Sequence, residues 1–163
     1  MRVGIGYDIH RLRLGGPLIL GGVEIPANFS LVGHSDGDCL IHAIIDALLG
    51  AAAEGDIGQH FPPSDKKLKG IKSTLMLEKV MGLLKEKGLA VVCVDSVIVA
   101  EKPKMAPYIP RMKQTLPPVL AIAESNLGIK AKTNEGLGEI GRLKAIACWA
   151  VCLLSEGHKS PPA

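Results

Sequence analysis

A carboxylate and an imidazole lie two residues apart near the start of the chain, in the segment GYDIHRL, residues 6–12. The segment is typical of an opening strand, in which residues i and i+2 point to the same face. Asp8 and His10 therefore project together, while Tyr7 and Ile9 point the other way. Such a pair could be half of a zinc site. Taken alone, it is more simply an exposed Asp–His pair at the end of a strand.

A third candidate ligand comes from the helical pattern that begins near Asp38. Asp38, His42 and Asp46 follow one another at intervals of four residues and form a polar stripe beside an apolar one. A solvated helix face would also explain this stripe. His42 lies close to its buried edge, however, where Asp46 could hold its second ring nitrogen. Asp8, His10 and His42 would then give three ligands with an open fourth position, the pattern of a catalytic zinc site.

Three polar segments could hold phosphate groups. Residues 34–38, HSDGD, offer His34, Ser35 and backbone amides just before a helix N-terminus, where anions are favoured. Lys102 and Lys104 follow the strongest strand pattern of the chain. The third segment is KTNEGLGEIGR, and it offers Lys132, Thr133, Glu135 and Arg142. Each signal is weak alone, because Gly-rich basic turns are common.

The elements that must position these residues form an α+β pattern. Strands are predicted near the N-terminus, in a hairpin around Gly21-Gly22, and over residues 89–101 and 129–135. Helices are predicted from Asp38, from an N-cap at Ser73, and over residues 143–154. The order of these elements indicates a two-layer sandwich, with a mixed sheet and helices packed on one face.

Two stretches between these elements are less regular. Residues 55–70 are predicted to be a loop, which is long for a compact domain and therefore of a kind that is usually functional or mobile. Between residues 102 and 126 we expect helical pieces that are broken by Pro110 and by Pro117-Pro118.

Composition excludes several classes of protein. The chain has 163 residues, 47% of them hydrophobic, and a net charge of +3. This length fits one compact domain, which we expect over residues 1–157, with a frayed tail at 158–163. The mild charge gives no sign of a nucleic-acid-binding protein, which usually has a strongly basic face with aromatic residues among the cations.

The four cysteines favour a reducing compartment. No two of them have C-x-x-C spacing, so free thiols are more plausible than a disulfide framework. The N-terminus lacks the pattern of a signal peptide. No apolar run reaches the roughly 18 residues that a membrane span needs. We therefore expect a cytoplasmic protein that binds neither membrane nor nucleic acid.

Residue patterns alone leave two classes of function open. One is a zinc-dependent hydrolase that uses Asp46 or Glu135 as its general base. The other is a non-enzymatic oligomer stabilised by a metal, in which the glycine-rich loops make contacts between subunits.

Four motifs taken together are far more specific than any one of them. GYDIHRL, GHSDGDCLIHAIIDALLGAA, GDIGQHFPPSD and TNEGLGEIGR resemble, in this order, the motifs of the 2-C-methyl-D-erythritol 2,4-cyclodiphosphate synthase family. The resemblance covers residues 2–154 and implies a homotrimer with active sites at subunit interfaces. The length of the chain, with no cytidylyltransferase-like region, favours the single-function form over a bifunctional fusion.

The implied reaction belongs to non-mevalonate isoprenoid biosynthesis. It converts 4-diphosphocytidyl-2-C-methyl-D-erythritol 2-phosphate to 2-C-methyl-D-erythritol 2,4-cyclodiphosphate and CMP, as a phosphorus–oxygen lyase. The 2-phosphate of the substrate attacks its own β-phosphorus, and CMP is the leaving group. Such a phosphoryl transfer needs mainly positioning and charge neutralisation, which fits a chain without an obvious activated Ser or Cys.

The resemblance also implies the metal ligands and the catalytic residues. Asp8, His10 and His42 correspond to zinc ligands, and Glu135 corresponds to the protein ligand of a second divalent ion, Mg²⁺ or Mn²⁺. The two residues that match positions stabilising the transition state are His34 and Thr133.

The implied substrate-binding residues come from every motif. Residues 56–58 would hold the methylerythritol part, residues 61–65 would form a mobile loop beside it, and residues 100–106 would read the cytosine through their backbone. Lys104 and residues 133–135 would come from the adjacent subunit. The full set is Asp8, Ile9, His10, His34, Ser35, Asp56, Ile57, Gly58, Phe61, Pro62, Pro63, Ser64, Asp65, Ala100, Glu101, Lys102, Pro103, Lys104, Met105, Ala106, Lys132, Thr133, Asn134, Glu135, Glu139 and Arg142.

Two positions depart from the family's pattern. Lys132 stands where the family often has Thr, so it could replace a neutral phosphate contact with a cationic one, or point away. Glu139 stands where many members carry Phe near the trimer axis. Three Glu139 side chains near one axis would repel one another unless paired, for instance by Arg142.

Overall fold

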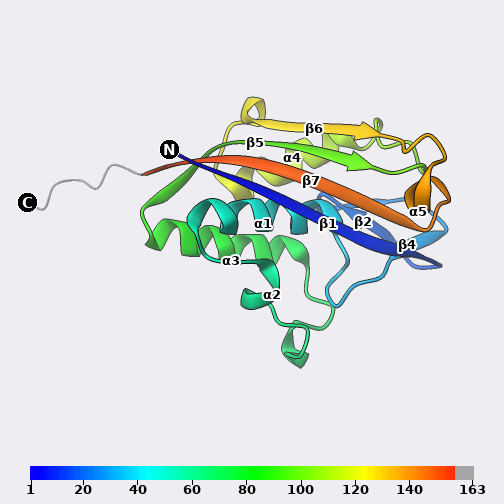
Figure 1. Ribbon diagram of the computed structural model, residues 1–163, viewed down its shortest axis with the longest axis horizontal. Coiled ribbons are helices and arrows are strands. Elements are labelled where there is room, and N and C mark those ends of the chain that lie inside the picture. The colour runs from blue at the N-terminus through cyan, green and yellow to red at the C-terminus, as the bar shows by residue number, and fades with distance from the viewer. Residues whose placement is uncertain (157–163) are drawn as a thin grey trace, which may run out of the picture.

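The computed structural model of the chain describes residues 1–156 (Figure 1). The boundary that the sequence suggests at residue 157 and the tail at 158–163 lie outside the described residues. The main sheet has the strand order β4-β1-β7-β5-β6. β5 and β6 are parallel and the other neighbours are antiparallel, so the sheet is mixed, as predicted. Its strands are β1 (Arg2–Leu14), β4 (Phe29–Leu31), β5 (Leu89–Val99), β6 (Leu127–Lys132) and β7 (Ala145–Glu156).

Helices cover one face of this sheet, as Figure 1 shows. α1 packs directly against β1 and β7, and α3 lies beyond it. No helix within residues 1–156 is long and apolar enough to cross a membrane. The helices are α1 (Cys39–Ala52), α2 (Ile57–His60), α3 (Ser73–Glu86), α4 (Ile109–Leu120) and α5 (Gly138–Gly141), and the 3₁₀ turns are η1 (Lys66–Leu68) and η2 (Glu124–Asn126).

The predicted hairpin is confirmed as β2 (Leu18–Leu20) and β3 (Val23–Ile25), which pair around Gly21-Gly22. Both glycines have positive φ, 60° and 71°, the conformation that a tight two-residue hairpin turn requires. The carboxylate of Asp38 accepts a hydrogen bond from each of their amides, at 2.9 and 2.6 Å. The hairpin is therefore fixed to the start of α1.

The prediction of a last helix at residues 143–154 was wrong, because this stretch is the central strand β7. Its buried residues alternate with outward-facing Trp149 and Val151, which is a strand period rather than a helical one. Both faces of the strand are apolar, and Cys148 and Cys152 are also four residues apart. Periodicity therefore does not separate helix from strand here.

The prediction of broken helical pieces at residues 102–126 was also wrong. Pro110 lies in the first turn of a continuous α4, where a missing N–H costs nothing. Pro117 and Pro118 lie in its last turn, so they remove few hydrogen bonds before the helix ends. Likewise, the predicted loop at 55–70 contains α2 and η1.

A close approach between β1 and α1 sets the geometry of the site. A Cβ atom added to Gly4 or Gly6 would lie 2.0 Å from the carbonyl oxygen of Ala47 or Ala43 in α1. The two glycines share a face of β1 with Asp8 and His10, which follow at the same alternation. The helix backbone can therefore lie directly on the strand, and its first turns come within reach of the Asp8 carboxylate.

We expect Gly6→Ala to lower the free energy of unfolding by about 1–3 kcal/mol, because the added methyl group overpacks this contact. Gly82→Ala is the matched control: Gly82 lies inside α3 with no atom near its added Cβ, so alanine there should stabilise the protein by roughly 0.5–1 kcal/mol. Urea unfolding of both variants measures the difference. A Gly6→Ala protein as stable as the parent would contradict the close approach.

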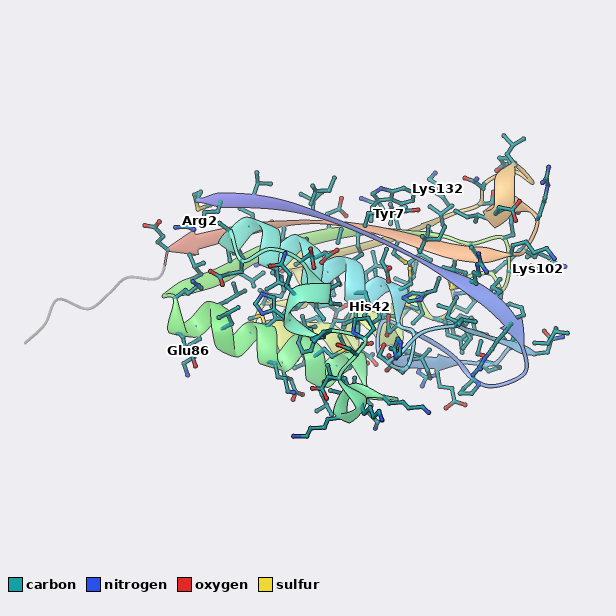
Figure 2. All side chains as sticks on the ribbon, turned by 60° about the horizontal axis from the view of Figure 1, so that its bottom comes forward. Arg2, Tyr7, His42, Glu86, Lys102 and Lys132 are labelled. Atoms are coloured by element: carbon teal, nitrogen blue, oxygen red, sulfur yellow. The ribbon has the colours of Figure 1, made fainter. Side chains whose placement is uncertain are left out.

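The other face of the sheet carries exposed apolar side chains in the single chain. Val3 and Ile5 are 70% and 71% exposed, and the rings of Tyr7 and Trp149 are tilted by 45° with their centroids 4.6 Å apart. Tyr7 lies on the side of the sheet opposite His42 (Figure 2). We call this surface the open sheet face; its residues are Val3, Ile5, Tyr7, Ile9, Trp149 and Val151.

Candidate metal centre

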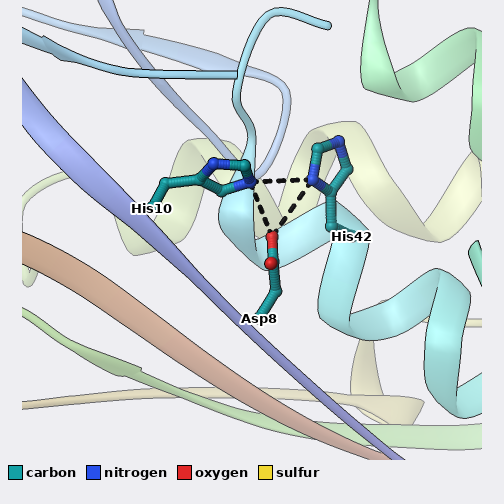
Figure 3. Close-up of side chains that lie close together, drawn as sticks. All are labelled: Asp8, His10 and His42. Carbon is teal, nitrogen blue, oxygen red and sulfur yellow. Dashed lines mark hydrogen bonds and ion pairs between the residues drawn. The ribbon is translucent and has the colours of Figure 1, made fainter. Parts of the chain in front are cut away.

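Asp8 and His10 of β1 meet His42 of α1 in one cluster (Figure 3). Asp8 Oδ2 lies 2.8 Å from His10 Nε2 and 3.1 Å from His42 Nδ1, and the two nitrogens are 3.1 Å apart. Strand geometry places Asp8 and His10 on one face, as predicted, and α1 brings His42 against them. The three residues proposed as metal ligands are therefore adjacent.

The second nitrogen of each imidazole has a partner of its own. His10 Nδ1 donates to the carbonyl oxygen of Val32 at 2.7 Å, so Nε2, which faces Asp8, is the nitrogen available to a metal once its proton is displaced. His42 Nε2 lies 2.9 Å from Ser73 Oγ and 3.0 Å from Ser35 Oγ, which leaves Nδ1 toward the same carboxylate. The prediction that Asp46 would hold His42 was wrong, since Asp46 accepts the amide N–H of Ile57 instead.

Charges within the cluster shift two pKa values in opposite directions. Burial alone would raise the pKa of the Asp8 carboxyl, but the hydrogen bonds and charges of His10 and His42 outweigh it and hold that pKa well below its usual range. Burial alone would lower the pKa of His10, but the hydrogen bond and charge of Asp8, together with the Val32 carbonyl, raise it. The cluster therefore attracts positive charge.

The donor set fits zinc. One carboxylate oxygen and two imidazole nitrogens, all within 4.8 Å of one another, are ligand types that zinc commonly takes. Each imidazole has its other nitrogen hydrogen-bonded, the arrangement that orients histidine ligands in metal sites. Three protein ligands leave a position for a further ligand, and the cluster lines a cavity from which such a ligand could come.

Zinc affinity should depend on pH through His10. Its raised pKa keeps the imidazole of the metal-free protein protonated to a pH above its ordinary value of 6.5, and zinc must displace that proton. We expect the affinity to level off above the raised pKa and to fall about tenfold per pH unit below it. Titration with a chromophoric chelator at several pH values measures this profile. His34→Ala should leave the profile unchanged, whereas a flat profile would show that no proton is displaced.

Asp38 has a structural role and is not part of a solvated helix face. Its side chain is completely buried, although the polar stripe predicted it to share a face with His42 and Asp46. It caps α1 by accepting the amide N–H of Ile41, in addition to those of the Gly21-Gly22 turn. This bracing fixes the first turn of α1, which carries His42.

The cluster lies in the wall of a cavity of about 320 Å³. The cavity brings together the HSDGD segment, the start of α2 and the segment that follows it, all of which the sequence suggested. Its lining residues are Asp8, His10, Gly33, His34, Ser35, His42, Ile57, Gly58, Phe61, Pro62, Pro63, Asp65, Leu68, Ile71 and Met76. Leu68, Ile71 and Met76 were missed, since apolar residues before and inside a helix give no signal that separates lining from core.

A second group of suggested residues lies outside this cavity, where β5 and β6 end. Thr133 Oγ1 donates to Glu135 Oε1 at 2.7 Å. Glu101 Oε1 accepts the backbone amides of Asn134 and Gly136, at 2.6 and 3.3 Å. The Glu101 carboxylate thus holds the turn that presents Glu135. Lys102 and Lys132 are exposed at this end of the sheet, away from His42 (Figure 2).

The segment at residues 100–106 is only partly available to a ligand. The side chains of Ala100 and Met105 are buried in the hydrophobic core, 6% and 3% exposed. Their backbone groups or the neighbouring exposed lysines, Lys102 and Lys104, would have to make any contact.

Glu139 and Arg142 form an ion pair at 3.4 Å on the surface of α5, the pairing that the sequence suggested. Glu139 lines a separate cavity of about 510 Å³ together with Ile9, Arg11 and Lys144. This cavity shares Ile9 with the open sheet face and shares no lining residue with the cavity of the metal cluster.

Comparison with known proteins identifies the family of the chain. A sequence profile of the YgbB family matches residues 1–155. The 2-C-methyl-D-erythritol 2,4-cyclodiphosphate synthase of Clostridium kluyveri is 53% identical over 159 residues, which cover 98% of this chain and 97% of that protein.

Two solved structures are also similar. The IspF of Plasmodium falciparum, solved as a CDP complex, is 37% identical with a TM-score of 0.84, over 96% of this chain and 97% of its own. The bifunctional IspDF of Campylobacter jejuni is 35% identical with a TM-score of 0.90 over 94% of this chain, which spans 42% of the IspDF chain. The chain therefore belongs to the YgbB family, and relatives that are 53%, 54% and 55% identical to it are named 2-C-methyl-D-erythritol 2,4-cyclodiphosphate synthases.

Proposed function

We propose that the protein converts 4-diphosphocytidyl-2-C-methyl-D-erythritol 2-phosphate to 2-C-methyl-D-erythritol 2,4-cyclodiphosphate and CMP. The observation that carries this proposal is the Asp8–His10–His42 cluster in the wall of a cavity formed by three of the family's motifs. Membership of the YgbB family and the CDP complex of the Plasmodium falciparum relative support a cytidine nucleotide as substrate.

The reaction is internally balanced. An oxygen of the 2-phosphate forms a bond to the β-phosphorus, the bond from that phosphorus to the oxygen bridging to the α-phosphate breaks, and CMP leaves with that oxygen. No water is consumed, so the protein acts as a phosphorus–oxygen lyase. Zinc held by Asp8, His10 and His42 would supply Lewis acidity and a template for the β-phosphate.

The chain's own residues position the substrate and exclude water. His34 and Ser35 lie in the cavity wall with the metal cluster, where they could donate hydrogen bonds to phosphate oxygens and, in the case of His34, stabilise the transition state. Phe61, Pro62 and Pro63 line the same cavity with apolar surface, which limits hydrolysis of the diphosphate. Residues 56–58 would hold the methylerythritol part, and residues 61–65 would form a mobile loop beside it.

The second group of residues completes the site from a neighbouring chain in our proposal. Thr133 would stabilise the transition state, and Glu135 would hold Mg²⁺ or Mn²⁺, which would neutralise phosphate charge. Neither residue lines the cavity of its own chain, which supports a contribution across a subunit interface. Residues 100–106 would bind the cytidine mainly through their backbone, near Lys132, Asn134 and Arg142.

A homotrimer would supply that interface. The open sheet face exposes six apolar or aromatic side chains on one side of the sheet, which a soluble monomer rarely leaves uncovered. We propose that three copies pack with these faces inward. Each copy is a single synthase domain over residues 1–157, and the trimer is cytoplasmic. In this trimer each cavity would lie on the side of the sheet that the helices cover, near the interface with the adjacent subunit.

Incubation with the diphosphocytidyl substrate, zinc and magnesium tests the proposed function. We expect CMP and the cyclic diphosphate to be released in equal amounts. A strong chelator should prevent the formation of both products. CMP with an open-chain diphosphate would indicate a zinc-dependent hydrolase instead. Absence of turnover in the metal-loaded protein would favour a binding or structural role for the metal.

A further inference from the structure

The Ser73 hydroxyl contacts His42 on the side of the ring that faces away from Asp8, and it does not line the cavity. Ser73 is the first residue of α3, it is completely buried, and its Oγ lies 2.9 Å from His42 Nε2. Ser73 is absent from the residues that line the cavity. The predicted role of Ser73 as the N-cap of α3 was wrong, since Lys72 has that position and the Ser73 side chain points to His42 instead.

Asp36 fixes the direction of the Ser73 hydroxyl. Asp36 Oδ1 accepts the Ser73 hydroxyl proton at 2.5 Å, and Oδ2 accepts the Ser73 backbone N–H at 3.0 Å. An ionised carboxylate can only accept hydrogen bonds, so the single hydroxyl proton of Ser73 must point to Asp36. Toward His42, Ser73 Oγ is then left only as an acceptor. In the neutral ring the proton is therefore on His42 Nε2, and Nδ1 keeps its lone pair for the metal.

Ser35 touches the same nitrogen but cannot impose this order. Its Oγ lies 3.0 Å from His42 Nε2 and 3.5 Å from Ser73 Oγ, and it accepts the amide N–H of Gly37 at 3.2 Å; within residues 1–156 no carboxylate holds its proton. It also lines the cavity, where a ligand can compete for it. Ser35 can therefore accept from His42 or donate to it, whereas Ser73 can only accept.

We propose that Asp36 and Ser73 are positioning residues that hold His42 in the tautomer and orientation that binds the metal. The chain of hydrogen bonds runs from Asp36 through the Ser73 hydroxyl to His42 Nε2. The carboxylate at the end of this chain makes the lone pair of His42 Nδ1 a stronger metal ligand. Sequence spacing could not reveal it, because Ser73 is 31 residues from His42 and lies on another helix. The inference rests on the zinc site of the proposed function.

The bond from the Ser73 backbone to Asp36 has a purely structural role, since it satisfies a free N–H at the start of α3. Ser73→Ala keeps this N–H and removes only the hydroxyl. The variant therefore separates the positioning of His42 from the stability of the helix.

Zinc affinity, measured for the full chain with Zn²⁺ alone against a chromophoric chelator, tests the proposal. We expect Ser73→Ala to weaken zinc binding about 10- to 100-fold, and Asp36→Asn to weaken it less, because a neutral amide can still accept from the hydroxyl. Ser73→Thr, which keeps the hydroxyl, should recover most of the affinity. Ser35→Ala is the matched control and should bind zinc nearly as tightly as the parent.

Each outcome decides between the two proposals. Equal zinc affinity in Ser73→Ala and the parent, or equal losses in Ser73→Ala and Ser73→Thr, overturns the role of the hydroxyl. If Ser35→Ala loses as much zinc affinity as Ser73→Ala, the positioning role is not specific to Ser73 and the proposal is wrong. A parent that binds no zinc overturns both proposals. A parent with the expected zinc affinities that forms no cyclic product overturns the proposed function alone.

Discussion

His42→Ala should leave a folded protein without stoichiometric zinc and with CMP release reduced at least about 10²- to 10³-fold, since a metal of this kind supplies several kcal/mol of charge stabilisation. His42 contributes one of three donors, and the remaining Asp8 and His10 come from a single strand. Two donors on one side of an ion cannot complete a tetrahedral site. Metal analysis of the dialysed protein and a CMP assay measure the two effects.

His60→Ala is the matched control. His60 is exposed on α2, lies outside the cavity lining, and its ring nitrogen is hydrogen-bonded to the carbonyl oxygen of Glu54. It should retain zinc and activity near those of the parent. If His42→Ala keeps its zinc and its cooperative unfolding, then the ligand set Asp8, His10 and His42 is wrong.

Ile5→Glu should convert the proposed trimer to monomers. Ile5 is 71% exposed in the single chain, so a carboxylate there costs the isolated fold little, but three such charges cannot be buried together without partners. Light scattering should show the mass fall from three times 17.2 kDa to 17.2 kDa. Activity should fall with it, since Glu135 of a neighbouring chain would no longer reach the cavity.

Leu75→Glu provides the comparison, because Leu75 is 45% exposed on α3, on the helical side of the sheet. It should leave both mass and activity unchanged. An Ile5→Glu protein that remains trimeric would show that the open sheet face is not the interface. A fully active monomer would show that one chain carries the whole site.

Two parts of the metal cluster could be predicted from local periodicity. Strand alternation puts Asp8 and His10 on one face, and the helical pattern puts His42 near the buried edge of α1. Their convergence was not predictable from spacing, since it depends on the close approach of α1 at Gly4 and Gly6. It came instead from the resemblance of four motifs to one family.

What holds the cluster was predicted incorrectly, for a physical reason. Asp46 lies one helical turn from His42, and such neighbours are easy to see in a sequence. The partners that the structure has, Ser73 and Val32, come from other elements and are brought close only by tertiary packing. Similarly, β7 was mistaken for a helix because it lies at the centre of the sheet with apolar residues on both faces.

The fate of solvent oxygen tests the proposed reaction most directly. The 2-phosphate is the nucleophile in our account, so turnover of the diphosphocytidyl substrate in water enriched in oxygen-18 should give a cyclic diphosphate and CMP that contain no oxygen from the solvent. Mass spectrometry of the two products measures this. An open-chain diphosphate, or a CMP, that carries one solvent oxygen would mean that water is the nucleophile, and it would contradict the assignment of the protein as a cyclodiphosphate synthase.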